Sequence, residues 1–189
     1  LARPVGTRPR STPQPTDKSI AIRKATIDPD GTPVVQAVTE SPPLRTEAMH
    51  FHTGASEEFW DFTEIVRDVV KRSSVGHGQI TIYTPHTTTS IVINESETGF
   101  LNDFRKAIDR AIPVDAYYEH DDHNVRTENM QEDEFINGHA HVRQLLVGQP
   151  SVTIPIVDGE VLLGQWQRVL YAELDQPRER RIFFHAQGV

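Results

Sequence analysis

The C-terminal part of the chain consists of short apolar segments separated by turn signals, and this pattern restricts the fold to one rich in β-structure. The segments are SVTIPIV, EVLLGQWQRVLYAEL and RRIFFHAQGV. Asp158-Gly159 follows the first segment and Gln176-Pro177 the second, and an Asp-Gly pair typically connects antiparallel strands. We therefore predict strands over residues 151–157, 160–174 and 180–189.

Two earlier segments have the apolar spacing of amphipathic helices. In the first, apolar side chains recur at this spacing at Phe59, Phe62, Ile65, Val66, Val69 and Val70. Ser56 or Asp61 could cap this helix. The second helix is predicted over residues 100–112, and Pro113 ends it because proline lacks a backbone N–H and clashes with the preceding turn.

The remaining segments complete a pattern of early helices and late strands. Residues 45–53 alternate enough to form a strand, and isoleucines two apart in segments 80–82 and 91–93 predict two adjacent half-buried strands. Residues 117–133 lack clean periodicity and predict a long loop. A short helix is predicted over residues 138–147, which Asn137 can cap and Gly148 ends. We expect an α+β fold, mainly an antiparallel β-sandwich with flanking helices.

The first 43 residues differ in composition from the rest of the chain. They are rich in Pro, with scattered Arg, Thr and Ser and little apolar periodicity. This composition predicts a disordered leader over residues 1–43 and a single domain over residues 44–189. The basic, acid-poor stretch before Ile27 could mimic a transit peptide, although a solvated tail is the preferred interpretation.

Charge and cysteine content exclude several classes of function. The 27 acidic and 19 basic side chains give a net charge of -8, which disfavours nucleic acid and anionic membranes as partners. The chain has no Cys, so disulfides, Cys-zinc sites and thiol nucleophiles are excluded. No apolar run is long enough to predict a membrane span. We expect a cytoplasmic protein.

The segment PHTTTSIVINE combines the residue types of a polar site. His86 lies between the two predicted strands and is followed by hydroxyl side chains, including Thr87 and Thr88, which could bind phosphate oxygens. Asn94 and Glu95 lie at the end of the next strand, just before a helix. The alternative is that the threonines reflect only β-propensity.

Further histidines lie in the predicted loop and the short helix that follows it. The loop sequence YYEHDDHN contains His120 and His123 among carboxylates, a mixture that suits a divalent ion or a solvated acidic loop. His139 and His141 would lie about 200° apart on a helix, so only one of them can point inward.

Two C-terminal segments offer further polar groups. Trp166 and Gln167 place a large aromatic ring and an amide in a predicted strand, where core filling is the alternative to a role in binding. Arg178, Arg180 and Arg181 follow a turn and could bind phosphate, or form a plain surface cluster.

A series of motifs occurs in the order found in the YjbQ-like family, which the chain resembles over residues 44–189. The motifs are PHTTTSIVINE, YEHD, AHVRQLLVG, LGQWQ and ELDQPRERR. This family is associated with a secondary thiamine-phosphate synthase activity. The resemblance implies a compact β-sandwich with flanking helices, a homotrimer, and a metal-associated histidine site.

The resemblance also implies roles for particular residues. It implies that the metal ligands are His86, His120 and His141, holding a divalent ion, either zinc or magnesium. The implied catalytic residues are His86, Glu95 and His141. The implied substrate-binding residues are Thr87, Thr88, Asn94, Arg143, Trp166, Gln167 and Arg178. His123 and His139 have no counterpart in the family, and the loop is lengthened over residues 125–135.

The expected function is therefore an enzyme acting on a small phosphorylated metabolite. The resemblance implies coupling of hydroxymethylpyrimidine diphosphate to thiazole phosphate, with release of pyrophosphate. Metal-dependent hydrolysis of a phosphorylated metabolite is one alternative. A trimeric protein that binds a metabolite or metal without catalysis is another.

Overall fold

The computed structural model describes residues 22–24, 44–131 and 133–189. The predicted leader over residues 1–43 lies outside the described residues except for the short strand β1 (Ile22–Lys24). The helices are α1 (Thr63–Ser73), α2 (Thr98–Ala111), the 3-10 turn η1 (Glu119–Asp121) and α3 (Gly138–Val147). The other strands are β2 (Leu44–His52), β3 (Phe59–Asp61), β4 (Gly78–Tyr83), β5 (Thr89–Asn94), β6 (Ser151–Val157), β7 (Glu160–Val161), β8 (Arg168–Glu173) and β9 (Glu179–Gly188).

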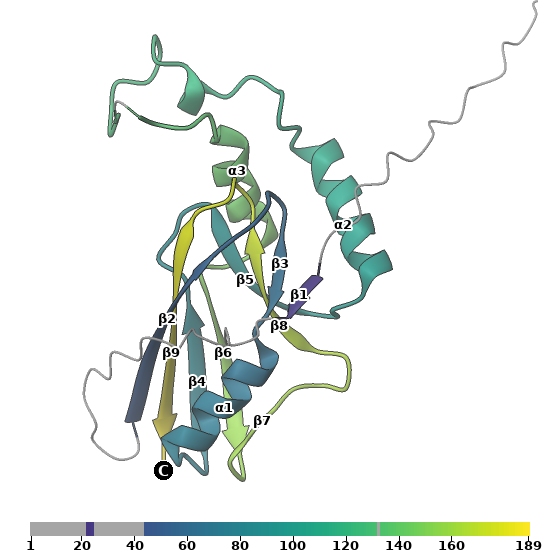
Figure 1. The fold of residues 1–189 in the computed structure, drawn as a ribbon, viewed down its shortest axis with the longest axis vertical. Helices are drawn as coiled ribbons and strands as arrows, with labels where there is room; N and C mark the ends of the chain where they lie inside the picture. Colours follow the sequence, from purple (N-terminus) through teal and green to yellow (C-terminus); the bar gives the residue numbers. More distant parts are fainter. Residues whose placement is uncertain (1–21, 25–43, 132) are drawn as a thin grey trace, which may run out of the picture.

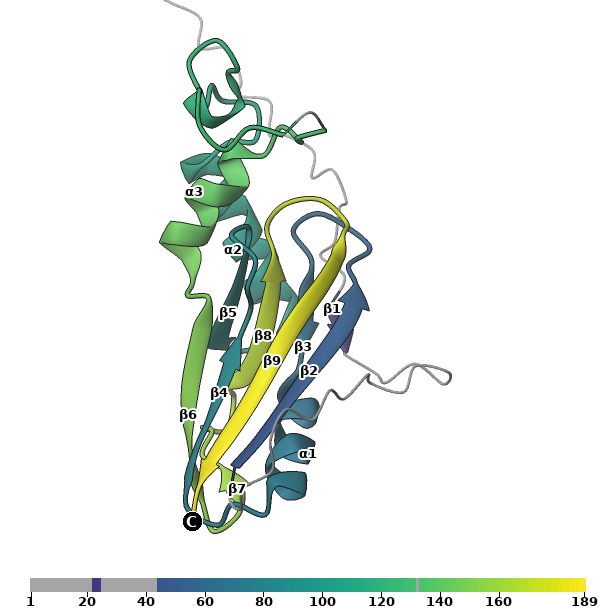
Figure 2. The same ribbon diagram turned by 90° about the vertical axis from the view of Figure 1, so that its left-hand side faces the viewer.

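The strands form two sheets, which are drawn in Figure 1 and from the side in Figure 2. The first sheet has the order β1-β3-β8-β5 and the second β2-β9-β4-β6-β7. All pairings are antiparallel except that of β1 with β3. The predicted α+β class with mainly antiparallel sheets is confirmed.

The main core lies between the two sheets and under α1. Strand residues alternate between faces, so every second side chain of a strand points to the same side. Ile80 and Ile82 of β4 and Ile182 and Phe184 of β9 point inward and are almost completely buried. They pack in one cluster with apolar residues of α1, including Val66, and with residues of β8. Burial of this apolar surface is the main favourable term in folding.

A second core lies on the other face of the first sheet, beneath α2 and α3. Leu170 and Ala172 of β8 face it, whereas their neighbour Tyr171 faces the main core. Leu101 of α2 and Ala140 of α3 complete this second cluster. Strand β8 is therefore buried on both faces.

None of the helices in the described part of the chain has the length and apolar character needed to span a lipid bilayer.

Two predicted elements are shorter than expected. The first helix was expected to include Phe59, but residues 59–61 instead form β3, which pairs with β8. The helix begins at Thr63, whose backbone N–H donates to the Asp61 carboxylate at 3.0 Å. The expected strand over residues 160–174 is interrupted between β7 and β8, because the chain turns at residues 164–167, where the Gly164 carbonyl accepts from the Gln167 N–H.

The long loop before α3 is fixed to that helix by Asp121. Its carboxylate accepts hydrogen bonds from the backbone N–H groups of Asn137 at 3.0 Å and Gly138 at 2.9 Å. Asn137, the predicted cap, occupies the cap position, but its side chain does not cap the helix. A Cβ atom at position 138 would lie only 2.6 Å from Tyr118 Cβ, so glycine permits the close contact between loop and helix.

Candidate functional site

A polar pocket of about 450 Å³ opens at the end of the sandwich that faces α3. It lies where the β4–β5 connection, the start of β9, the end of the long loop and α3 meet. Its lining includes a group of predicted site residues from three distant parts of the sequence. These are His86, Thr87, Thr88, His141 and Arg178.

The ring of His86 is held by the first residues of β9. Its Nε2 accepts the backbone N–H of Arg181 at 2.9 Å. Burial lowers the pKa of His86, and the positive charges of Arg180, Arg181 and Arg178 lower it further. The ring is therefore neutral at neutral pH. Because Nε2 accepts a hydrogen bond, the proton lies on Nδ1, which can donate to an anion.

Acidification is expected to protonate His86 only below the ordinary histidine pKa of 6.5. In the unfolded chain the His86 ring takes up a proton at a higher pH than in the folded protein. The contribution of neutral His86 to the free energy of unfolding is therefore fully present above pH 6.5, and it is lost as the pH falls through the pKa of the folded protein. Protonation of Nε2 also breaks the contact with the Arg181 N–H, because two donors then face each other. NMR titration of the His86 ring should give a midpoint below 6.5. A midpoint above that value contradicts the described environment.

A buried ion pair supports the floor of the pocket. Arg180 donates to both carboxylate oxygens of Glu173, at 2.6 and 2.7 Å. Glu173 has no exposed surface and Arg180 is 4% exposed. Arg180 also donates to Thr88 Oγ1 at 3.3 Å, and Thr53 donates to Glu173 at 3.0 Å. Although burial raises the pKa of Glu173, we assign it as ionised, because a bidentate guanidinium directly faces it.

Arg178 forms the charged side of the pocket. Its Nη2 lies 2.8 Å from Asp175 Oδ2, and its guanidinium packs 4.6 Å from the centre of the Phe135 ring. The ion pair is short but does not have the direction of a hydrogen bond. Nε and Nη2 of Arg178 are therefore both buried without a hydrogen bond to the residues that the structure describes. Glu134 Oε2 and Asn137 Oδ1, on two other lining residues, are also buried without a hydrogen bond to a described residue.

Buried side-chain atoms without a hydrogen bond occur in several parts of the described fold, and four of them lie on residues that line this pocket. A buried polar atom without a partner costs about 1–3 kcal/mol, so most buried polar atoms in proteins are paired. Here they occur together on three residues that line one cavity. Nε and Nη2 of Arg178 are donors that an anionic ligand could pair with after small movements of the side chains, whereas Glu134 Oε2 and Asn137 Oδ1 are acceptors.

The predicted histidines of the loop and of α3 also come together. The rings of His120 and His141 have their centres 4.4 Å apart. Burial, followed by the neighbouring His120, lowers the pKa of His141, which keeps that ring neutral at neutral pH. Arg126 stabilises the arrangement by donating to the His120 carbonyl at 3.1 Å and to Glu134 at 2.8 Å.

The predicted three-histidine metal site does not assemble within the described residues. Among residues 22–24, 44–131 and 133–189, no three His, Asp or Glu side chains are arranged to hold a metal ion. The Nε2 atom of His86 is occupied by the Arg181 N–H, and the guanidinium groups around His86 repel a cation. The donor set therefore fits an anion better than a divalent metal, and we derive no step through a metal.

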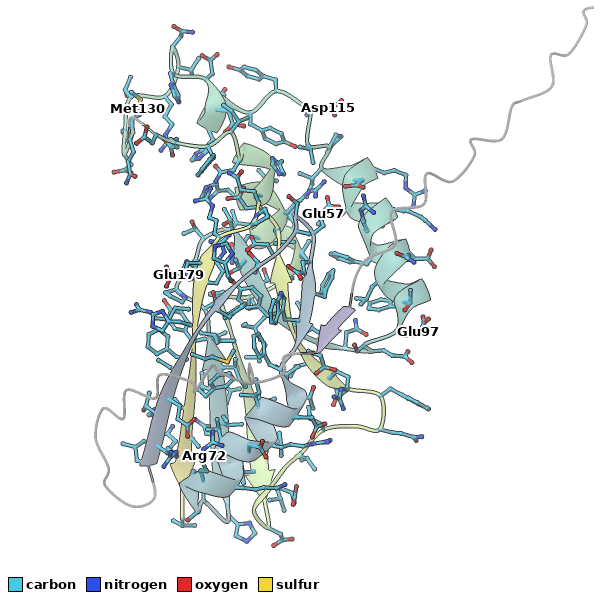
Figure 3. All side chains as sticks on the ribbon, in the orientation of Figure 1. Glu57, Arg72, Glu97, Asp115, Met130 and Glu179 are labelled. Atoms are coloured by element: carbon cyan, nitrogen blue, oxygen red, sulfur yellow. The ribbon has the colours of Figure 1, made fainter. Side chains whose placement is uncertain are left out.

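Arg143, a predicted substrate-binding residue, lies inside the fold instead of in the pocket. It is completely buried and forms ion pairs with Glu57 and Asp109, the latter at 2.8 Å. It also donates to the Ile112 carbonyl at 2.8 Å. Figure 3 shows Glu57 between α2 and α3, where Arg105 of α2 also pairs with it at 2.7 Å. Arg143 thus connects α3 to α2 and to the loop before β3.

The other predicted residues lie at the opposite end of the first sheet. Asn94 pairs with Arg168 across β5 and β8, whereas Thr89, next to the pocket, pairs with Glu173. The two ends of β5 are about 16 Å apart at a rise of about 3.3 Å per residue. Glu95 is exposed at the far end, beside the turn that contains Trp166 and Gln167. Trp166 is 65% exposed and therefore does not fill the core.

Several residues that line or support the pocket were not among the residues to which the resemblance gives a role. Arg180 was one of the three arginines expected either to bind phosphate or to form a surface cluster. Glu173 does not line the pocket but pairs with Arg180, and its signal in the sequence is a carboxylate directly after the apolar residues 169–172. Asn137 was predicted only as a helix cap, and Glu134 carried no signal that separates it from neighbouring acidic residues. Their roles depend on contacts between strands, helix and loop that are far apart in sequence.

Comparison with known proteins agrees with this architecture. The sequence profile of the family described as UPF0047 protein YjbQ-like matches residues 47–189. The chain belongs to this family. The matched YjbQ-like region includes every residue of the polar pocket.

Relatives and solved structures of YjbQ-like proteins are similar over most of the chain. A UPF0047 protein from Archaeoglobus fulgidus is 37% identical over 134 residues, covering 71% of this chain and 94% of the relative. One from Methanothermobacter thermautotrophicus is 34% identical over 137 residues, covering 72% and 87%. The structure of a YbjQ-like protein of unknown function from Sulfolobus solfataricus superposes with a TM-score of 0.67 at 28% identity, covering 77% of this chain and 98% of that protein.

Proposed function

We propose that the polar pocket binds the phosphate or diphosphate group of a small metabolite and that the protein catalyses group transfer from it. The observation that carries this proposal is the convergence of three hydrogen-bond donors on one cavity, namely the guanidinium of Arg178, the His86 ring and the Thr87 hydroxyl. Phosphate oxygens accept hydrogen bonds from all three groups, and guanidinium is the strongest of these donors.

The charged residues that line the cavity are two arginines, Arg178 and Arg180, and two acidic residues, Asp133 and Glu134, of which Glu134 pairs with Arg126. Glu173 neutralises Arg180, and Asp175 lies on one side of Arg178. The remaining donors of Arg178 and of the neutral His86 ring are not compensated in this way. A phosphate group would complete the hydrogen bonding of these atoms without removing the ion pairs that stabilise the fold.

The two neutral imidazoles provide hydrogen-bond donors for a leaving group. His86 and His141 both line the cavity, and burial lowers the pKa of each below the ordinary value. The attacking thiazole nitrogen of the coupling reaction carries no proton, so a neutral ring would act on the leaving diphosphate, which its N–H stabilises. In the reaction implied by the family resemblance, the bond from the pyrimidine methylene carbon to diphosphate oxygen breaks as the thiazole nitrogen bonds to that carbon. Arg178 would then stabilise the departing pyrophosphate.

The reaction is tested by incubating the protein with hydroxymethylpyrimidine diphosphate and thiazole phosphate. We expect thiamine phosphate and pyrophosphate to form in equal amounts. Release of pyrophosphate or phosphate without coupling would instead identify a hydrolase. Saturable binding of the diphosphate without turnover would identify a binding protein that does not catalyse this transfer.

Pyrophosphate binding tests the pocket separately from the reaction. Arg178→Ala is expected to weaken pyrophosphate binding about 10-fold to 100-fold in isothermal titration calorimetry, because hydrogen bonds to charged groups contribute about 1.5–3 kcal/mol. Arg67→Ala is a matched control, since Arg67 pairs with Glu64 and Arg178 with Asp175, each three residues earlier in the chain. Equal affinities of the two variants would place the anion elsewhere.

A further inference from the structure

The lining of the polar pocket contains two groups of opposite hydrogen-bonding character, which come from different parts of the chain. The donor group lies around the start of β9 and in the β4–β5 connection and consists of His86, Arg178 and Arg180. The acceptor group ends the long loop before α3 and consists of Asp133, Glu134 and Asn137. The proposed phosphate site uses only the donor group, so the acceptor group has no role in it.

Asp133 supplies an accessible negative charge. The residue is exposed and lines the pocket. Its carboxylate forms no ion pair or hydrogen bond with any other residue that the structure describes. An ionised carboxylate accepts hydrogen bonds and donates none, so this group attracts a cation and repels a phosphate.

Glu134 and Asn137 each leave one acceptor atom unused. Oε1 of Glu134 accepts from Arg126 at 2.8 Å, whereas Oε2 is buried without a hydrogen bond to a described residue. Nδ2 of Asn137 donates to the Asp175 carboxylate at 3.0 Å, which fixes the direction of the amide and makes the unpaired atom the oxygen. Asn137 is only 6% exposed, and a buried acceptor is costly unless a donor pairs with it.

The donor and acceptor groups adjoin each other. Oδ2 of Asp175 lies 2.8 Å from Arg178 Nη2 and also accepts from Asn137 Nδ2. Phe135, directly after Glu134 in the chain, packs 4.6 Å from the Arg178 guanidinium. A short molecule in the cavity could therefore contact both groups at once.

A ligand that is only anionic matches one of the two groups. Pyrophosphate can accept from Arg178, but the charges of Asp133 and Glu134 on the same cavity oppose its binding. A protonated amine has three N–H donors and no acceptor. It therefore complements the acceptor group both in charge and in hydrogen bonding.

We propose that the polar pocket binds a small zwitterionic phosphate, whose phosphate contacts Arg178 and whose alkylammonium group contacts Asp133 and Glu134. The phosphate end of this inference rests on the proposed function, and the ammonium end is independent of it. Neither precursor of the coupling reaction carries an alkylammonium group. The inference therefore names a further class of ligand for the same pocket.

Isothermal titration calorimetry with a matched pair of ligands tests the ammonium end. Aminoethyl phosphate carries a phosphate and an ammonium group, and in hydroxyethyl phosphate a hydroxyl of similar size replaces the ammonium. We expect the wild-type protein to bind aminoethyl phosphate about 10-fold or more tightly than hydroxyethyl phosphate, because hydrogen bonds between charged groups are stronger than those of a neutral hydroxyl.

Two variants locate the ammonium group. Asp133→Asn changes an exposed residue and should leave the fold intact, whereas Glu134→Gln also weakens the pair with Arg126. Each should reduce the preference for aminoethyl phosphate about 3-fold, the scale of a partly solvated ion pair, without weakening hydroxyethyl phosphate. Asp115→Asn is the control, because Asp115 is exposed near the end of α2 and does not line the pocket (Figure 3). Thermal melting verifies the fold of each variant.

The outcomes separate this inference from the proposed function. Equal affinities of the wild type for the two phosphates, or a preference that is unchanged in both Asp133→Asn and Glu134→Gln, overturns the proposal. If pyrophosphate still binds in that case, the proposed phosphate site stands without the ammonium site. If ethanolamine binds as tightly as aminoethyl phosphate and pyrophosphate does not bind, the ammonium site is supported and the proposed function fails.

Discussion

Replacing Glu173 by Gln is expected to lower the free energy of unfolding by about 3–5 kcal/mol, the largest effect of any single substitution that we predict. Glu173 has no exposed surface and accepts both hydrogen bonds that hold the buried guanidinium of Arg180. Glutamine removes the negative charge and leaves Arg180 as an unpaired cation in the interior. Chemical denaturation measures the change directly.

Two further variants define the cause of this loss. Glu179→Gln removes a carboxylate from the start of the same strand as Arg180, but that side chain is 77% exposed and the substitution should cost less than about 0.5 kcal/mol. Replacing Glu173 by Gln together with Arg180 by Met should recover part of the stability, because no unpaired charge then remains in the core. A loss below about 1 kcal/mol for Glu173→Gln would contradict the buried ion pair.

Replacing His86 by Ala is expected to reduce the rate of the proposed transfer about 100-fold to 1,000-fold, the range that the loss of one hydrogen-bond donor to a developing negative charge typically costs. The ring lines the cavity and is held neutral, with its donor nitrogen free to stabilise the leaving phosphate. The rate constant kcat, measured with both precursors, is the relevant quantity.

Chemical rescue separates stabilisation of the leaving group from a structural role of His86. Added imidazole can enter the space left by the deleted ring and should restore part of the rate if the ring donates to the leaving phosphate. His77→Ala is the control, because His77 lies outside the pocket and 61% of its side chain is exposed. A His86→Ala protein that folds normally and turns over as fast as wild type would show that His86 has no catalytic role.

The parts of the fold that follow from local pattern could be predicted from the sequence. The short helix over residues 138–147 and the strand over residues 151–157 coincide with α3 and β6, because apolar spacing and the neighbouring Gly and Pro define them. The short strand over residues 59–61 could not be separated from the helix after it. Its state depends on pairing with β8, which is distant in sequence and invisible to local periodicity.

The candidate site was predictable to a similar extent. His86, Thr88, His141 and Arg178 do share a cavity. Arg143 does not, since an arginine on a helix gives no local sign that it turns into the protein to pair with Glu57 and Asp109. The homotrimer implied by the family resemblance stays a prediction. The exposed apolar side chains of α3, Val142, Leu145 and Leu146, offer a surface on which it could form.

A crystal structure of the protein grown with pyrophosphate tests the central claim most directly, because it locates the anion without reference to any reaction. We predict density for pyrophosphate in the polar pocket, in contact with Arg178 and with the donor nitrogen of His86. Pyrophosphate bound at another site, with these two side chains still unoccupied, would contradict the assignment of this pocket as the phosphate site.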